Sequence, residues 1–174
     1  MGLEYYRIEE QLVAALPEIR PATERYWQEE GKPGEDCGPY IFFEGLFVHY
    51  VKVLLVMETS PGRDRLLTRA FQFVDKMLIS DDGDVATLAY VGLLEWREPW
   101  FYVRAGTFMG LGARASLDRH DPPWRQHESS GASPTEQEKA RMFDFYDLRS
   151  VILSELANEV VTLEAIPGVT HDRS

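Results

Sequence analysis

Cysteine is almost missing from this sequence of 174 residues, because Cys37 is the only one. A single thiol excludes an intramolecular disulfide and a cluster of thiolate metal ligands. Cys37 follows Asp36 and has no obvious cation beside it, which does not favour an activated thiolate nucleophile. A reducing cytoplasm is therefore the expected location of the protein.

Positive charge is also scarce, with 18 Lys and Arg residues against 29 Asp and Glu and a net charge of -11. Nucleic acid is not an expected ligand, because binding to phosphates needs a basic face. An acidic chain instead suits a soluble protein, or one that meets a basic partner, since opposite charge speeds association.

Long apolar runs are limited to "YIFFEGLFVHYVKVLLVM", residues 40–57. This run contains Glu44, His49 and Lys52, and ionisable side chains are costly at the centre of a bilayer. We therefore predict a buried core helix and no contact with a membrane, although its β-branched residues leave a strand possible over part of its length. The N-terminus lacks the basic and apolar regions of a signal peptide.

Catalytic motifs are missing as well. The sequence has no Gly-rich phosphate loop after a strand, no GxSxG, no HExxH and no CxxC. His49 lies five residues from Glu44, so the two do not share a helix face, and it is expected to be a hydrogen-bonded core residue. His120 and His127 fall in a polar stretch that is expected to be a solvated loop. We predict no enzyme activity, no cofactor and no metal.

What the sequence does have is helical periodicity. Apolar residues recur every three or four positions along most of the chain, which predicts an all-α fold class. Glu9 falls on the polar side of the first helix, which Pro17 ends. We predict one domain over residues 1–158, a loose tail over 159–174, and antiparallel helix pairs like those of helical-repeat proteins. The expected helices, about seven, cover 5–16, 17–30, 40–58, 61–79, 83–97, 100–117 and 133–158.

Capping signals mark several helix ends. Ser60 followed by Pro61 predicts the start of one helix, and Ser133 with Glu136 predicts a capping box at the start of the last. Glycine weakens helices, so Gly106 and Gly110 inside the predicted helix 100–117 need a reason. Four residues apart, they are expected to let a neighbouring helix come close.

The turn that holds Asp81, Asp82 and Asp84 is the densest group of candidate metal ligands. A calcium loop of the EF-hand type requires oxygen ligands at alternate positions, and neither register through this turn supplies them. A corner between two helices explains the residues better, with Gly83 in the turn and Asp82 or Asp84 as the N-cap of the next helix. The same aspartates can also form an acidic patch that faces a partner.

Aromatic residues cluster around the Glu98-Pro99 break and include Trp96 and Phe101, which are expected to fill the core. Trp100 in this cluster and Trp124 in a polar stretch are expected to be exposed, where tryptophan often anchors a protein partner. The predicted partner-binding residues are therefore Asp81, Asp82, Asp84, Trp100 and Trp124.

Four stretches together resemble a family of small bacterial helical proteins of unassigned biochemical activity. They are "LPEIRPATERYW", "PYIFFEGLFVHYVKVLL", "FQFVDKMLISDDGDVATLAYVGLLEW" and "MGLGARASLDRHDPPW". The resemblance covers residues 8–124 and is most specific over 71–95, where F-x-F-[VI]-[DE]-x-[ML] precedes an acidic turn and a helix ending V-x-x-L-E. The sequence departs from this pattern after Glu95 and in its long C-terminal helix. The matching residues are Phe71, Phe73, Val74, Asp75, Met77, Asp82, Asp84, Val91, Leu94 and Glu95.

Proteins that look like this often occur beside secreted-toxin genes and are suspected immunity proteins. The resemblance implies a cytoplasmic protein that binds and neutralises a cognate toxin domain without chemistry of its own, and the acidic composition agrees with a basic toxin. Two alternatives remain. One is a structural helical module that self-associates, and the other is a small hydrolase or metal-dependent enzyme that uses His49 with Glu44, or His120 with His127.

Overall fold

A computed structural model describes residues 2–31, 38–95, 97–143 and 145–164, with side chains described as far as Asn158. Every regular element in these residues is a helix, which confirms the predicted all-α class. The structure has ten continuous helical stretches there, against the seven or so expected. The three additional stretches all lie after residue 98.

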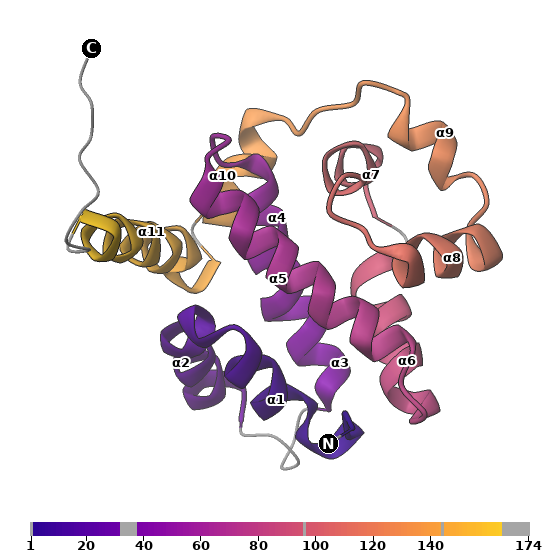
Figure 1. Cartoon of the computed structure of the whole chain (residues 1–174), viewed down its shortest axis with the longest axis horizontal. Coiled ribbons are helices and arrows are strands. Elements are labelled where there is room, and N and C mark those ends of the chain that lie inside the picture. The colour runs from indigo at the N-terminus through magenta and orange to yellow at the C-terminus, as the bar shows by residue number, and fades with distance from the viewer. Residues whose placement is uncertain (1, 32–37, 96, 144, 165–174) are drawn as a thin grey trace.

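The N-terminal part follows the proline signals closely. The predicted break at Pro17 is confirmed, because the first helix ends at Ala15 and Pro17 opens a short 3-10 turn. The elements of this part are η1 (Tyr5–Arg7), α1 (Ile8–Ala15), η2 (Pro17–Ile19) and α2 (Arg20–Glu30). In Figure 1 they form the lower left of the molecule. Cys37 lies outside the described residues.

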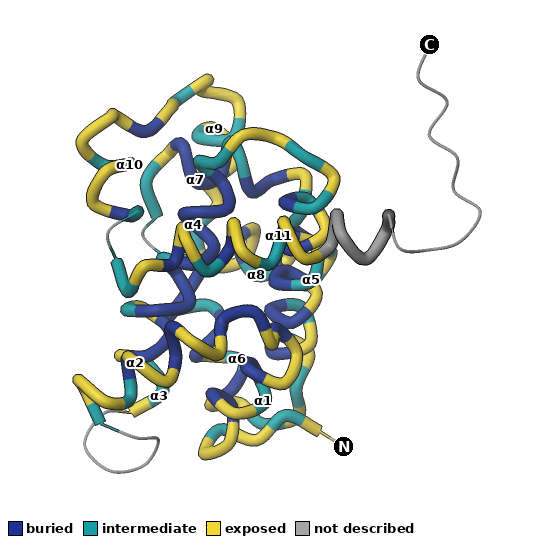
Figure 2. Tube along the Cα trace, turned by 90° about the vertical axis from the view of Figure 1, so that its left-hand side faces the viewer, coloured by how far each residue is buried: buried dark blue, intermediate teal, exposed yellow. Residues whose placement is uncertain are grey.

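The long apolar run forms one helical rod through the centre of the molecule, as predicted, and no strand. It comprises α3 (Pro39–Phe42), the π-helical turn η3 (Phe43–Phe47) and α4 (Val48–Val56). By length and hydropathy the rod could cross a membrane, but 61% of it is buried inside the structure. Figure 2 shows the buried part in dark blue, surrounded by more exposed helices. This burial is what a core helix requires.

Helix α5 (Pro61–Leu78) is the longest regular α-helix whose side chains are all described, and it packs against α4, α6 and α8. Ser60 is its N-cap, with its hydroxyl accepting a hydrogen bond from the Arg63 backbone N–H at 3.2 Å. The apolar face expected for this segment is buried as far as Met77, whereas Leu78 at its end is half-buried. The buried members include Leu66, Leu67, Ala70, Phe71, Val74 and Met77.

After the acidic turn, α6 (Gly83–Ala89) continues into a second π-helical segment, η4 (Tyr90–Leu94). The two π segments pack against each other, because a Cβ added to Gly92 would lie 3.1 Å from the Cβ of Phe43. Arg97 satisfies the end of η4, since its guanidinium donates to the backbone carbonyl oxygen of Leu93 at 2.8 Å.

The predicted single helix over 100–117 is wrong, because the chain forms α7 (Pro99–Ala105) and then α8 (Leu111–His120). Gly110 is the N-cap of α8 in an extended conformation. The Asp75 carboxylate of α5 lies against Gly110 and accepts a hydrogen bond from the Ala113 backbone N–H at 2.9 Å. Gly110 therefore allows a close approach, as predicted, but the neighbour is the Asp75 carboxylate at the N-terminus of α8 and not a packed helix. Phe101 is buried as expected, whereas Trp96 lies outside the described residues.

The C-terminal third departs furthest from expectation. A short helix, α9 (Trp124–Glu128), forms within the predicted loop. The predicted helix 133–158 is instead α10 (Glu136–Phe143), the turn η5 (Phe145–Asp147) and α11 (Leu148–Glu164). The chain breaks there because Tyr146 and Asp147 have positive φ angles of 45° and 54°.

The start of α10 and the end of α11 also differ from the prediction. The capping box is formed by Thr135 and Glu138, in which each backbone N–H donates to the other side chain, and not by Ser133 and Glu136. Helix α11 continues to Glu164, beyond the predicted start of the tail, and residues 165–174 lie outside the described residues.

Candidate functional site

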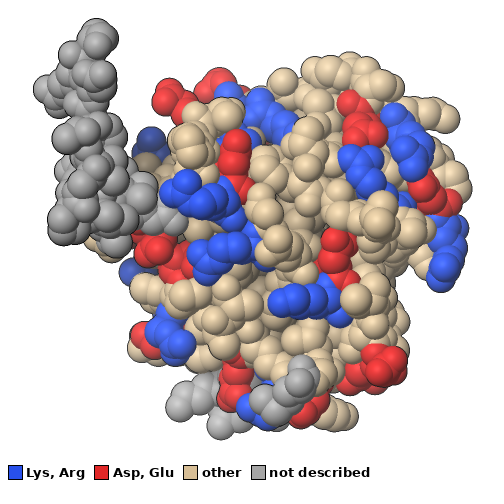
Figure 3. Space-filling model, viewed as in Figure 1, with Lys and Arg blue, Asp and Glu red and all other residues tan. Residues whose placement is uncertain are grey.

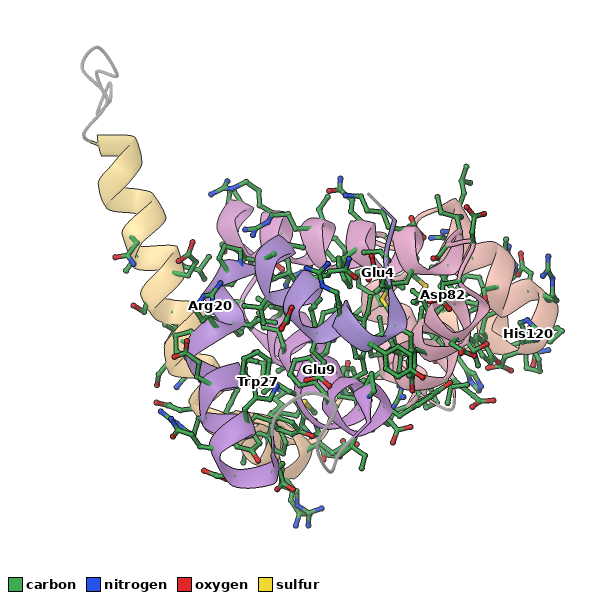
Figure 4. The ribbon with its side chains drawn as sticks, turned by 90° about the horizontal axis from the view of Figure 1, so that it is seen from below. Glu4, Glu9, Arg20, Trp27, Asp82 and His120 are labelled. Atoms are coloured by element: carbon green, nitrogen blue, oxygen red, sulfur yellow. The ribbon has the colours of Figure 1, made fainter. Side chains whose placement is uncertain are left out.

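The corner between α5 and α6 is organised by Asp82. One carboxylate oxygen accepts hydrogen bonds from the backbone N–H groups of Asp84 at 3.0 Å and Val85 at 3.4 Å, which confirms the predicted N-cap of α6. The other oxygen accepts one from the Tyr5 backbone N–H at 3.2 Å. Asp82 therefore joins η1 to the corner, and Figure 4 shows it beside the N-terminal segment that carries Glu4.

Asp81 and Asp84 are exposed at this corner. No group of three or more His, Cys, Asp or Glu residues in the described part of the chain is arranged to hold a metal ion. In the view of Figure 3, acidic and basic side chains are interspersed, and acidic ones lie at the lower right near α6. The two carboxylates are thus available to a basic group from outside the molecule.

Tyrosines surround the corner on the side of η1 and α3. The ring of Tyr5 lies 5.5 Å from that of Tyr6 and 6.3 Å from that of Tyr40, and Tyr6 is 87% exposed. Partial burial raises the pKa of Tyr5 and of Tyr40, and the negative charge of Asp84 raises both further. These phenols therefore stay protonated near neutral pH and can donate hydrogen bonds.

Ile79 is the most unusual residue of the corner, because this large aliphatic side chain ends α5 and is 75% exposed. A pocket of about 390 Å³ lies on one side of it, between α5, α6 and α8. A second pocket of about 510 Å³ lies on the other side, against α1 and the N-terminal segment. We call them the α8 pocket and the α1 pocket, and Ile79 lines both.

The rim of the α8 pocket has an apolar and a basic part. Leu111 is 88% exposed and precedes the lining residue Ala115 by one helical turn, which places both on one face of α8. Arg119 and His120 line the other end, where the His120 ring lies 4.8 Å from that of Tyr90. Arg119 is exposed and makes no ion pair within the described part of the chain.

The predicted exposure of Trp100 and Trp124 is wrong, because they are 3% and 0% exposed. Helix α9 packs on α7 and turns Trp124 inward, where its indole N–H still donates to Asp118 at 2.9 Å. Arg125 covers the ring of Trp124 from outside, with its guanidinium carbon 4.9 Å from the ring centre. Neither tryptophan can anchor a partner directly, and of the predicted partner-binding residues only the three aspartates lie at the corner.

The three histidines in the described part of the chain lie against aromatic rings. His49 stacks on Phe145 with ring centres 4.0 Å apart, and its burial lowers its pKa. His127 stacks on Tyr102 at 6.0 Å, while His120 meets Tyr90. The structure therefore places the three rings in separate contacts, each on a different pair of elements. Sequence spacing could not reveal these contacts, because each one joins separate elements.

Two buried carboxylates were not predicted from the sequence. Glu9, expected on a polar face, is 3% exposed and accepts a hydrogen bond from the Trp27 indole N–H at 2.8 Å, as Figure 4 shows. Burial raises the pKa of Glu9. Glu18 is 7% exposed and accepts hydrogen bonds from the Tyr50 hydroxyl at 2.7 Å and from Arg69 at 3.0 Å. Both carboxylates join helices within the core and lie away from the corner.

Comparison with known families finds one match. Residues 9–103 match the model of a family described as a domain of unknown function, DUF7674. The chain belongs to the DUF7674 family. The DUF7674 match runs from α1 into α7 and includes the acidic corner, whereas α8 to α11 follow it. No curated protein and no solved structure matches the chain significantly.

Proposed function

We propose that this DUF7674 protein binds another protein through the α5–α6 corner, and that the partner is a bacterial toxin domain that it neutralises in the cytoplasm. The observation that carries the proposal is the exposure of Ile79, at 75%, between two pockets and next to exposed carboxylates. The chain would act by covering the toxin and would perform no chemistry.

Physical chemistry favours a protein as the ligand of this surface. Removing a large aliphatic side chain from water is favourable, and a tight contact with another protein would bury Ile79. Asp81 and Asp84 would add attraction for a basic partner, and the net charge of -11 would speed the encounter. An apolar centre with charged neighbours is also the usual composition of a protein interface.

The identification of the partner as a toxin rests on the resemblance to suspected immunity proteins. Such a protein needs only to bind tightly over the active site of its toxin. An acidic corner would suit a toxin whose active site is basic, as that of a nuclease is, because basic groups there would otherwise contact phosphates.

A growth assay tests this function. The toxin domain encoded beside the gene would be expressed in a host together with the wild-type chain or with a variant. We expect the wild type to restore growth, and Asp81→Lys with Asp84→Lys to restore it poorly, because two attractive charges become repulsive. Glu24→Lys with Glu58→Lys is the matched control, since these acidic residues are exposed, the first on α2 and the second before α5, at the other end of that helix from the corner. Failure of the wild type to restore growth or to bind the purified toxin domain would overturn the proposal.

A further inference from the structure

We infer that the partner presents an amphipathic helix to the corner, with one apolar side chain in the α8 pocket and another in the α1 pocket. This inference rests on the proposed function, because it describes how the same surface holds its partner. Ile79 would lie between the two anchors, and a basic side chain of the helix would face Asp81.

The pockets suit apolar anchors. Leu78, Ala86 and Ala115 contribute apolar lining to the α8 pocket. Leu3 and Phe73 do so for the α1 pocket. Volumes of about 390 Å³ and 510 Å³ are at the lower end of ligand pockets and leave room for a large side chain each.

A helix fits this arrangement better than a strand. Because Ile79 lines both pockets, the two pockets adjoin along this one side chain. Residues four apart on a helix face have Cβ atoms about 6 Å apart, and residues seven apart lie about 10 Å apart along the axis. Ile79 would then insert between such a pair, as a knob enters the hole of a facing helix. A strand would require a free sheet edge, and the described residues form no sheet.

The charged residues around the two pockets predict which end of the partner helix is basic and which end is acidic. Asp81 and Asp82 line the α1 pocket together with Lys76, so the charge there is negative on balance. Arg119 and His120 line the far end of the α8 pocket. The partner helix should therefore carry Lys or Arg at its end over the α1 pocket, and Asp or Glu at its end over Arg119.

Selection from a library of helical peptides tests the inference without the natural partner. The probe is a three-helix scaffold with one randomised helix face, selected on the wild-type chain alone and then measured against each variant. We expect enriched sequences with apolar residues four or seven apart and a basic residue beyond one of them. Their affinity should fall at least about tenfold for Ile79→Asp and for Ala115→Trp, which fills the α8 pocket.

Leu153→Asp is the matched control, because Leu153 is 44% exposed on α11 and should leave the affinity unchanged. Both apolar-to-Asp variants alter exposed side chains, and circular dichroism would verify that each remains folded. Enriched peptides without the spacing, or peptides that bind Ile79→Asp as well as the wild type, would overturn the inference. Sedimentation of the wild type as a dimer that Ile79→Asp abolishes would also overturn it, by assigning the surface to a second copy.

The two proposals fail separately. If the toxin domain binds Ile79→Asp as tightly as the wild type but binds Asp81→Lys with Asp84→Lys poorly, the corner still binds the toxin and the docking of a helix between the two pockets fails. If patterned peptides bind with the expected sensitivity while the toxin domain does not bind at all, the docking surface stands and its assignment to a toxin fails.

Discussion

Asp82 shows how one carboxylate connects parts of a chain that are far apart in sequence. Its two oxygens serve different purposes, since one caps α6 and the other holds the backbone of Tyr5. The first role was predictable, because an aspartate before a helical pattern is a frequent N-cap. The second was not, because a contact across 77 positions leaves no local pattern.

Replacing Asp82 by Ala should therefore cost more than the loss of a cap. We expect the free energy of unfolding to fall by about 1–3 kcal/mol, since the cap and the hydrogen bond from Tyr5 are lost together. Urea denaturation followed by circular dichroism measures it. Asp81→Ala is the control and should change stability by less than about 0.5 kcal/mol, because Asp81 is exposed. Equal effects of the two substitutions would contradict the role assigned to Asp82.

Glu9 is a second single residue with a measurable consequence. Its pKa is raised by burial in the folded state, so the folded protein keeps this proton at pH values where the unfolded chain has lost it. The resulting stability is complete below about pH 4, near the pKa of an unfolded glutamate, and is lost as the pH rises through the folded-state pKa.

Glu9→Gln should accordingly be more stable than the wild type near neutral pH, because a neutral amide avoids the cost of a buried charge and can still accept the hydrogen bond from Trp27. The difference should shrink as the pH falls toward about 4. Denaturant unfolding at a series of pH values measures it, with Glu24→Gln on exposed α2 as the control. A variant that is less stable than the wild type near neutral pH would refute this interpretation.

Helix boundaries were predictable where the signal is local. Ser60 and Asp82 begin α5 and α6 as their sequence contexts indicate, and Pro17 separates the first two helices. The break between α7 and α8 was not predictable, because it depends on the Asp75 carboxylate of another helix. The inward position of Trp124 likewise depends on α9 packing against α7. Of the candidate site, the sequence therefore predicted the aspartates of the corner, while Ile79 and the pockets required the packed helices.

Gly110 at the start of α8 and Gly83 at the start of α6 can be compared directly. A Cβ at Gly110 would collide with the Asp75 carboxylate, whereas a Cβ at Gly83, the first residue of α6, would meet nothing within 4 Å. Gly110→Ala should therefore destabilise the protein by about 1–3 kcal/mol, because overpacking displaces the carboxylate that binds α8. Gly83→Ala should be neutral or stabilising by up to about 1 kcal/mol. Thermal unfolding of both variants measures the contrast, and a tolerated Gly110→Ala would contradict the close approach.

The core extends well beyond the segment that matches the DUF7674 family. One cluster of buried residues includes Ile8 near the N-terminus and Ile152 in α11. Helix α11 packs against η2, α2, α4 and α5, all of which lie within the matched segment. The elements after α7 therefore complete the same core, so the end of the family match is not expected to be the end of a folding unit.

A chain that ends after Gly106 tests whether the whole molecule needs the elements after α7 in order to fold. It removes Trp124, Leu148 and Ile152, each 0% exposed, and uncovers the residues that they contact. Loss of one large buried side chain costs about 3–5 kcal/mol, and a domain is stable by only about 5–15 kcal/mol. We expect the shortened chain to lose cooperative thermal unfolding and near-ultraviolet circular dichroism, whereas a chain ended after Glu164 keeps both. A shortened chain that unfolds as cooperatively as the full one would mean that the matched segment folds independently and that α8 to α11 are an accessory to it.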